Sequence, residues 1–278
     1  MPEYLRALCF ILFAAFIVFM FGKRIACPVI IPEKVYNRRR NLWFFLTLTV
    51  FFSHNFWIFY IISALLIVYS YQYEQNKFAL YLFLLLAVPN FSKVLRLSNL
   101  QILQFDYLRL LGFTILLPTL IGLKRISPHA PRYRIHLQDL ILVTYLLLHF
   151  FLYFKVHSST QQVRFAIYLF TGSFLPIYIA VRTLNSIEDI HDALISFTIV
   201  CMILAVIGFL EFSRHWLLYF SVKKALGLDW PFIYYLERGG VLRAVATSGQ
   251  PIALGYAMAV ALGILTYFKR TISNGMNW

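Results

Sequence analysis

The stretch ERGGVLRAVATSGQPIALGYAMAVALGILTYF, residues 237–268, joins a polar half that carries two arginines to an apolar half. A helix of about 20 apolar residues crosses a bilayer core about 30 Å thick, so the apolar half is long enough to act as a membrane anchor. The whole chain of 278 residues has the same character, being 61% hydrophobic, 18% aromatic and only 13% charged. A soluble domain of this size has no interior large enough for so much apolar surface. The sequence therefore predicts an all-α fold, a polytopic transmembrane helix bundle.

Apolar segments separated by short basic interruptions recur along the chain and predict about eight or nine membrane segments in a single integral membrane domain, residues 1–278. The first segment is expected to be a retained helix and not a signal peptide, because its start is weakly basic and no small-residue cleavage site follows. Residues 53–55 interrupt another segment, which is either one long tilted helix or two short passes. The expected spans are Leu5–Phe21, Leu42–Phe52, Phe56–Tyr71, Phe78–Pro89, Tyr107–Leu123, Leu137–Phe154, Gln162–Val181, Ala193–Phe212 and Pro251–Phe268.

The distribution of Lys and Arg orients the predicted bundle, since cytoplasmic loops retain these residues and short exported loops do not. Two passes between residues 42 and 71 place the basic clusters 23–40 and 124–134 on the same side, whereas a single pass separates them. The two-pass arrangement is therefore expected. It makes residues 213–250 an extracytoplasmic loop, in which residues 215–230 are either an interfacial amphipathic segment or a plain connector.

Several classes of function are disfavoured by the sequence. The net charge of +14 comes from Lys and Arg between apolar segments and not from a polar domain, so we expect no nucleic-acid partner. The cysteines Cys9, Cys27 and Cys201 lack the spacing of a disulfide frame or a zinc site, and the histidines are not spaced as metal ligands. The sequence has no HExxH, GxSxG, P-loop or GxGxxG pattern. We therefore expect neither a metal nor an organic cofactor.

Arginines inside apolar segments are candidates for a site, because a charge there costs at least about 2.5–3.5 kcal/mol and usually faces a polar cavity or partner. Arg109 lies one turn into its expected helix and is predicted to snorkel to the lipid headgroups. Arg164 lies at the outer edge of its expected helix, where it is either a structural anchor or part of a functional site.

Arg238 and Arg243 form a stronger candidate because they flank Gly239–Gly240, and glycine permits turns and the close approach of a ligand. The planar guanidinium pairs bidentately with phosphate oxygens. The run TSGQP at 247–251 then leads into a helix whose first N–H groups favour an anion. The pattern predicts a pyrophosphate site that includes Gln250, or alternatively an anchor for lipid headgroups.

The motif RGGVLRAVATSGQPIALGY, residues 238–256, resembles the start of the core region of the O-antigen ligase and O-antigen polymerase family. The stretches RRRNLWFFLTLTVFFSHNFW at 38–57 and EFSRHWLLYF at 211–220 resemble the branch found with bacterial exopolysaccharide loci. The resemblance spans the whole chain and implies a GT-C-like bundle in the bacterial inner membrane. It also implies transfer of a glycan from an undecaprenyl-pyrophosphate donor to an acceptor glycan or glycolipid on the periplasmic face.

The resemblance further implies that Arg243 is the arginine that heads the family motif and binds the pyrophosphate of the donor. Arg238, Gln250 and Arg164 are weaker candidates for the same donor phosphate. Family members are longer and carry a second arginine and a histidine, the proposed base, in a large downstream loop. We therefore expect a truncated form without this base; His215 and Glu237 lie on the correct side, but their spacing in the sequence does not support them as substitutes.

The expected function is thus that of a membrane glycosyltransferase of the ligase or polymerase type in polysaccharide biosynthesis, with the lipid bilayer as its surroundings. Two alternatives stay open. One is a multi-pass transporter or lipid-linked glycan flippase, although the sequence shows no pair of related halves with matching broken helices. The other is a non-catalytic assembly subunit.

Overall fold

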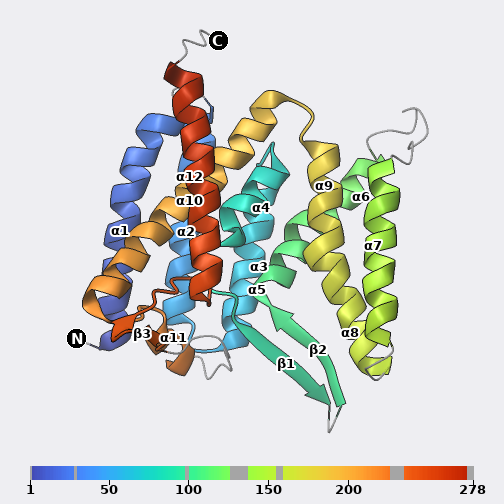
Figure 1. Cartoon of the computed structure of the whole chain (residues 1–278), viewed down its shortest axis with the longest axis horizontal. Helices are drawn as coiled ribbons and strands as arrows, with labels where there is room; N and C mark the ends of the chain where they lie inside the picture. Colours follow the sequence, from blue (N-terminus) through green and yellow to red (C-terminus); the bar gives the residue numbers. More distant parts are fainter. Residues whose placement is uncertain are drawn as a thin grey trace.

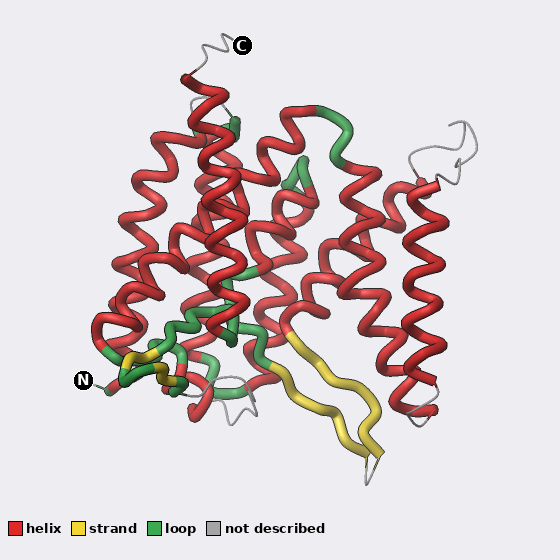
Figure 2. The backbone as a smooth tube through the Cα atoms, viewed as in Figure 1, coloured by secondary structure: helices red, strands yellow, loops and turns green. Residues whose placement is uncertain are grey.

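The computed structural model describes residues 2–27, 30–97, 100–125, 137–154, 159–225 and 235–273. It is mostly helical, with two short antiparallel strand pairs (Figure 1; Figure 2). The elements are α1 Glu3–Ala26, α2 Glu33–Phe52, α3 Phe56–Gln72, α4 Lys77–Leu85, β1 Ser92–Leu97, β2 Leu100–Asp106, α5 Tyr107–Leu111, η1 Gly112–Leu116, α6 Leu117–Arg125, α7 Leu137–Phe154, α8 Ser159–Leu169, η2 Phe170–Phe174, α9 Leu175–Thr183, α10 Ile187–Arg214, α11 Phe220–Ala225, β3 Glu237–Arg238, β4 Val241–Leu242 and α12 Pro251–Ser273.

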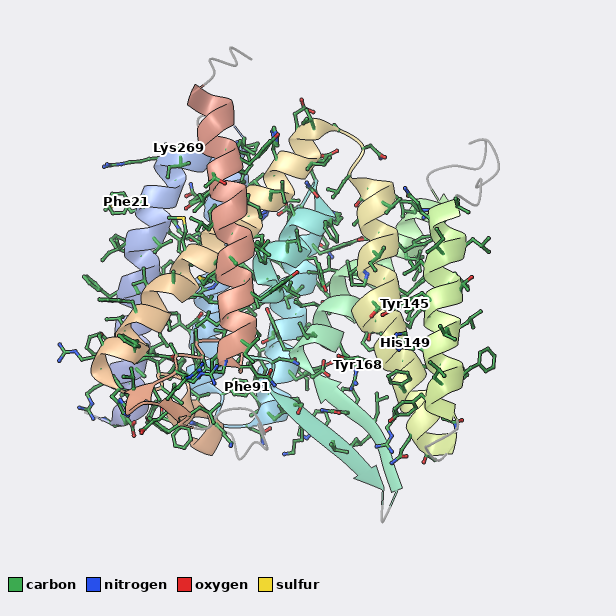
Figure 3. All side chains as sticks on the ribbon, in the orientation of Figure 1. Phe21, Phe91, Tyr145, His149, Tyr168 and Lys269 are labelled. Atoms are coloured by element: carbon green, nitrogen blue, oxygen red, sulfur yellow. The ribbon has the colours of Figure 1, made fainter. Side chains whose placement is uncertain are left out.

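Long apolar helices support the expected membrane protein. Within the described ranges, four helices are long and apolar enough to cross a membrane: Glu3–Ala26, Thr160–Thr183, Ile187–Arg214 and Pro251–Lys269. Three more apolar helices are shorter. Large apolar side chains project outward from the outer helices, as Phe21 does from α1 (Figure 3). The finer expectation of eight or nine crossings stays a prediction.

Successive helices alternate in direction, so their connections gather at two ends of the molecule (Figure 1). The N-terminus, the turn between α2 and α3 and both strand pairs lie at one end, which we call the hairpin end. The connections from α1 to α2 and from α9 to α10, with the last residues of α12, lie at the other, which we call the Arg39 end. The loops are divided between the two ends as the two-pass arrangement predicts.

The interruption at residues 53–55 separates two helices. His54 has a φ of 46°, a left-handed conformation in which a helix does not continue. The side chain of Asn55 then caps α3, its oxygen accepting a hydrogen bond from the backbone N–H of Trp57 at 2.8 Å. The structure therefore has two helices here and not one long helix, as the expected two-pass arrangement requires.

The N-terminal boundary of α2 differs from the expectation. The helix starts at Glu33 and not at Leu42, so Arg38, Arg39 and Arg40 lie on the helix and not in a loop. The added turns contain Glu, Lys and Arg, which favour helix, and have no glycine or proline after Pro32. The arginines are therefore fixed in direction by the helix.

The connection between the fourth and fifth apolar segments also differs from the expectation. The expected span Phe78–Pro89 is the nine-residue helix α4, whose side chains are mostly buried. Phe91, where the chain turns away from α4, is fully buried (Figure 3). An antiparallel hairpin, β1 with β2, follows in place of a plain loop. The described chain is still mostly helical, so the expected all-α class is confirmed, with two short strand pairs added to it.

Two helices contain a π-helical turn, and each π turn precedes a proline. Gly112–Leu116 comes before Pro118, and Phe170–Phe174 comes before Pro176. Proline lacks the N–H that the helix needs, and a wider turn accommodates the lost bond. The chain therefore stays helical through Tyr107–Arg125 and through Ser159–Thr183, as the expected spans require.

The core of the molecule lies around α10. This helix packs against α4, α12 and α1, and it buries Ile199, Val200, Ile203 and Leu204. It runs obliquely from the Arg39 end to the hairpin end (Figure 1). Its last turn therefore provides a fixed base for the loop that was predicted to carry the site.

Candidate functional site

A buried carboxylate holds the loop that precedes α12. Glu211, in the last turn of α10, is 1% exposed. One carboxylate oxygen accepts hydrogen bonds from the backbone N–H groups of Val245 at 2.9 Å and Ala246 at 2.8 Å. The other accepts the N–H of Leu218 at 3.2 Å. Ala246 has a φ of 47°, so these bonds hold a backbone conformation that alanine rarely adopts.

The glycine pair forms the turn of a small hairpin. Gly239 and Gly240 have φ values of 61° and 77°, the positive pair that a type I′ turn needs. The turn pairs β3 with β4, and Arg238 lies exposed beside it. The glycines therefore serve the backbone turn, and a close ligand is not needed to explain them.

Arg243 follows β4 and lies between the hairpin and the loop held by Glu211. Its backbone N–H donates to the carbonyl of Leu236 at 2.8 Å. Its side chain is partly exposed, and the guanidinium makes no hydrogen bond or ion pair with the described residues. The backbone at Arg243 is thus fixed while the charge stays available to a ligand.

His215 and Glu237 are brought together at the same place. His215 caps the C-terminal end of α10 with a φ of 51°. Its Nε2 lies 2.9 Å from Oε1 of Glu237, and both side chains are about half exposed, at 48% and 50%. Glu237 directly precedes Arg238 on β3. The sequence did not predict this pair because 22 residues separate its members. They meet because the left-handed conformation of His215 ends α10 at this point.

The start of α12 follows the loop that Glu211 holds. Gln250 is exposed, and its carbonyl accepts the N–H of Leu254 at 3.0 Å. The N–H groups of Ile252 and Ala253 make no hydrogen bond within the part of the chain that the structure describes. The first turn of α12 therefore presents free donors beside the arginine-bearing loop, as the sequence predicted.

Arg164 is not part of this group. It lies on α8, across the molecule from β3 and β4 (Figure 1). It lines a separate pocket of about 290 Å³ with Arg109, Gln104, Tyr153, Gln161, Phe165 and Tyr168. Figure 3 shows Tyr168 beside the β1–β2 hairpin. The expectation that Arg164 and Arg243 bind the same donor phosphate therefore has no geometric support.

Arg109 does not snorkel outward as expected. Its side chain is 9% exposed and turns back onto the carbonyl of Gln104 and the carboxylate of Asp106, with Nη1 3.4 Å from Oδ2. Its guanidinium carbon lies 5.7 Å from the ring centre of Tyr168. Burial raises the pKa of the Asp106 carboxyl, although the charge and the backbone N–H of Arg109 oppose that rise. The arginine is satisfied locally, which removes its need for headgroups.

A second buried charge, that of Arg39, lies toward the end of the molecule opposite to the hairpin end. Arg39 is 2% exposed and bonds Glu74, with Nη2 at 2.8 Å from Oε1, and Asp192, with Nη1 at 2.5 Å from Oδ1. Ser196 accepts from Nη1 at 2.7 Å, and Arg38 donates to Glu74 at 3.1 Å. This network ties α2 to α10 and to the segment after α3. The arginines at 38 and 39 were expected in a cytoplasmic loop, and here they are structural.

These geometries define one candidate site at the hairpin end, which consists of Arg238, Arg243, Gln250 and the His215–Glu237 pair. It offers two cations and one imidazole held by a carboxylate, a set suited to binding an anion and accepting a proton. The described residues contain no group of three or more His, Cys, Asp or Glu side chains that could hold a metal ion.

Comparison with known proteins adds no further assignment. No protein-family model, no characterised protein and no solved structure matches the chain. The resemblance to the O-antigen ligase and polymerase family therefore stays a prediction from the sequence motifs.

Proposed function

We propose that the protein is a membrane glycosyltransferase that takes a glycan from a polyprenyl-pyrophosphate donor at the hairpin end. The observation that carries this proposal is that one small hairpin carries Arg238 next to Glu237, the partner of His215, and leads directly into Arg243. A transfer of this kind requires cations for the leaving pyrophosphate and a base for the acceptor hydroxyl. The hairpin supplies both classes of group.

The donor side of the proposal depends on Arg243. Its guanidinium makes no ion pair with a described residue, and its backbone is fixed by the bond to Leu236 and by the neighbouring contacts of Glu211. A cation on a fixed backbone near the leaving group stabilises the negative charge that develops there. We expect Arg238, Gln250 and the first N–H groups of α12 to contact the remaining phosphate oxygens.

The acceptor side depends on His215. With Glu237 ionised, Nε2 of His215 donates to it and Nδ1 is left as a proton acceptor. The oxygen of an acceptor hydroxyl then forms a bond to the anomeric carbon of the donor sugar. The bond between that carbon and the pyrophosphate oxygen breaks, its electron pair leaves with the polyprenyl pyrophosphate, and the hydroxyl proton passes to Nδ1. No nucleotide sugar is consumed.

The proposed cellular setting is the bacterial inner membrane with the hairpin end outside the cytoplasm. Lys23, Lys34 and the arginines of α2 lie toward the opposite end, as do Arg182 and Lys269. Retention of such residues on the cytoplasmic side supports this orientation. Donor and acceptor would then be bound at the periplasmic surface.

The test uses purified protein in proteoliposomes that contain a radiolabelled glycan on undecaprenyl pyrophosphate. Release of undecaprenyl pyrophosphate and growth or transfer of the glycan are measured together. Arg243→Lys keeps the charge but loses the bidentate fork, so we expect a rate loss on the order of 100-fold. His215→Asn keeps a residue that tolerates the left-handed backbone and should lose transfer while still binding the donor.

Arg214→Lys is the matched control, because Arg214 is exposed in the last turn of α10 at the same end. It should transfer at the wild-type rate. Movement of the labelled lipid across the membrane without transfer would refute the proposal and favour a flippase. Donor binding with no transfer, even alongside co-expressed partner proteins, would favour a non-catalytic assembly subunit.

A further inference from the structure

The run Arg38–Arg39–Arg40 on α2 sends its three side chains to different faces of the helix, because successive helical residues are rotated by about 100°. Arg39 turns into the core, where it forms ion pairs with Glu74 and Asp192. Arg40 lies on the side of α2 that faces α1, where it lines a cavity. Arg38 lies on the side that faces α3. Arg38 also pairs with Glu74, so Arg40 is the one arginine of the run that has no acidic partner among the described residues.

The cavity between α1 and α2 has a volume of about 730 Å³ and two chemically distinct parts. Its wall is apolar and consists of Phe16, Phe19, Met20 and Phe44. Phe16 and Met20 are 60% and 46% exposed, so the groove opens to the surroundings of the bundle. Its basic rim consists of Lys23, Arg24 and Arg40.

The floor of this groove is rigid. Phe19 is 2% exposed, and its carbonyl accepts a hydrogen bond from the hydroxyl of Tyr36 at 2.6 Å. The same hydroxyl lies 2.9 Å from the position of a Cβ on Gly22, so a larger residue there would force the buried ring of Tyr36 to shift. The groove is therefore a built feature of the α1–α2 contact and not a gap between loosely packed helices.

The charges of the rim are only partly neutralised. Lys23 pairs with Glu33 at 2.5 Å. Arg40 donates to the neutral side chain of Asn41 at 2.9 Å, and neither Arg40 nor Arg24 forms an ion pair with a described residue. Two guanidinium groups therefore stand uncompensated above an apolar wall.

We propose that the groove between α1 and α2 binds an anionic phospholipid, with its phosphate at Arg24 and Arg40 and an acyl chain along Phe16, Met20 and Phe44. A soluble anion would leave the apolar wall uncovered, and a neutral lipid would leave the two guanidinium groups unpaired. Basic pockets between transmembrane helices on the cytoplasmic side suit anionic headgroups. The groove lies toward the Arg39 end, which is opposite to the proposed transfer site and independent of it.

The test is native mass spectrometry of the full chain, extracted in detergent and mixed with phosphatidylglycerol, cardiolipin or phosphatidylcholine. We expect one tightly retained anionic lipid, with cardiolipin retained more strongly than phosphatidylglycerol. Removing both guanidinium groups in Arg24→Gln/Arg40→Gln should weaken retention by roughly tenfold or more, because two charge-assisted contacts to phosphate are lost. Arg214→Gln/Lys269→Gln changes the net charge equally at exposed positions outside the groove and should retain the lipid.

Equal retention in the groove variant and the charge-matched control would overturn the proposal. So would phosphatidylcholine binding as strongly as the anionic lipids, or glycerol phosphate in solution displacing them at comparable concentration. Tryptophan fluorescence checks that each variant is folded. If the double glutamine variant is unfolded, Met20→Ser tests the apolar wall alone, and unchanged lipid retention in it would count equally against the proposal.

Discussion

The contact between Glu211 and the loop before α12 gives the sharpest prediction, because it is buried and its bonds are few. The perturbation is Glu211→Gln, which keeps the shape of the side chain. The single amide oxygen can still accept from Val245 and Ala246 when it occupies the position of Oε2. The amide NH₂ group must then face the N–H of Leu218, where two donors meet and one bond is lost.

The size of the effect follows from these bonds. A hydrogen bond to a charged group contributes about 1.5–3 kcal/mol, and a buried donor without a partner costs about 1–3 kcal/mol. In Glu211→Gln the bonds to Val245 and Ala246 become neutral, and the bond to Leu218 is lost. These changes should destabilise the loop by roughly 2–4 kcal/mol. Since each 1.4 kcal/mol is a factor of ten, the loop should open about 30 to 700 times more often.

Hydrogen exchange followed by mass spectrometry measures this opening directly. Peptides that cover residues 243–250 should exchange faster in Glu211→Gln by the factor given above, while peptides from α4 change much less. Glu188→Gln is the control, since Glu188 is exposed in the first turn of the same helix. It should alter stability by less than about 0.5 kcal/mol.

Unchanged exchange at residues 243–250 in Glu211→Gln would refute the reasoning, because it would mean that the carboxylate does not hold the loop. Faster exchange over the whole chain would instead show that the contact supports the entire bundle. The transfer activity offers a second measurement. If the loop fixes Arg243, Glu211→Gln should lower the rate without changing the insertion of the protein into the membrane.

Three further predictions concern other parts of the fold. Arg39→Gln takes the arginine from Asp192 and leaves Glu74 with Arg38 alone, so it should cost about 3–5 kcal/mol in unfolding free energy, measured by thermal unfolding in detergent; a loss below about 1 kcal/mol would contradict the buried network. Gly22→Ala places a methyl against the hydroxyl of Tyr36 and should cost about 1–3 kcal/mol, which Tyr36→Phe in the same chain should largely restore; failure of that rescue would argue against the close contact. In a chain with its native cysteines replaced, Val241→Cys should be labelled by an impermeant reagent from outside intact cells and Asn185→Cys only after permeabilisation; the reverse pattern would invert the proposed orientation.

The positions of the helices were largely predictable, because a long apolar run has few alternatives in a membrane protein. The break at residues 53–55 was expected from the distribution of basic residues, and the left-handed residue His54 with the capping residue Asn55 forms it. The start of α2 was not predictable from apolar character. Arginines interrupt the apolar run there, but they do not interrupt the helix, and only the tertiary partners of Arg39 make that position tolerable.

Like the start of α2, the hairpin β1–β2 was not predicted from the sequence. The segment contains alternating apolar and polar residues, the pattern of a strand, yet between two apolar helices it was expected to be a loop. The candidate site was predicted only in part. Arg238, Arg243 and Gln250 were predicted because they are close in sequence, whereas Glu211 binds the backbone of the loop between them and His215 binds Glu237 from the end of α10. Partners so far apart in the sequence meet only when the helices pack.

The use of the acidic residues connects the fold to its function. The chain has only 11 Asp and Glu against 25 Lys and Arg. Several of the acids are buried or nearly buried, and each of these holds a particular partner: Glu74 and Asp192 hold Arg39, Asp139 holds Arg182, Asp106 holds Arg109, and Glu211 holds backbone N–H groups. A carboxylate in an apolar bundle is costly unless it is paired, so these acids are committed to structure. The arginines left without an acid, among them Arg24, Arg40 and Arg243, then lie at the two ends of the bundle, where phosphate groups of lipids are the available counter-charges. Under the two proposals made above, these arginines belong to two separate phosphate sites, and charge-neutral substitutions at them should alter ligand binding far more than stability.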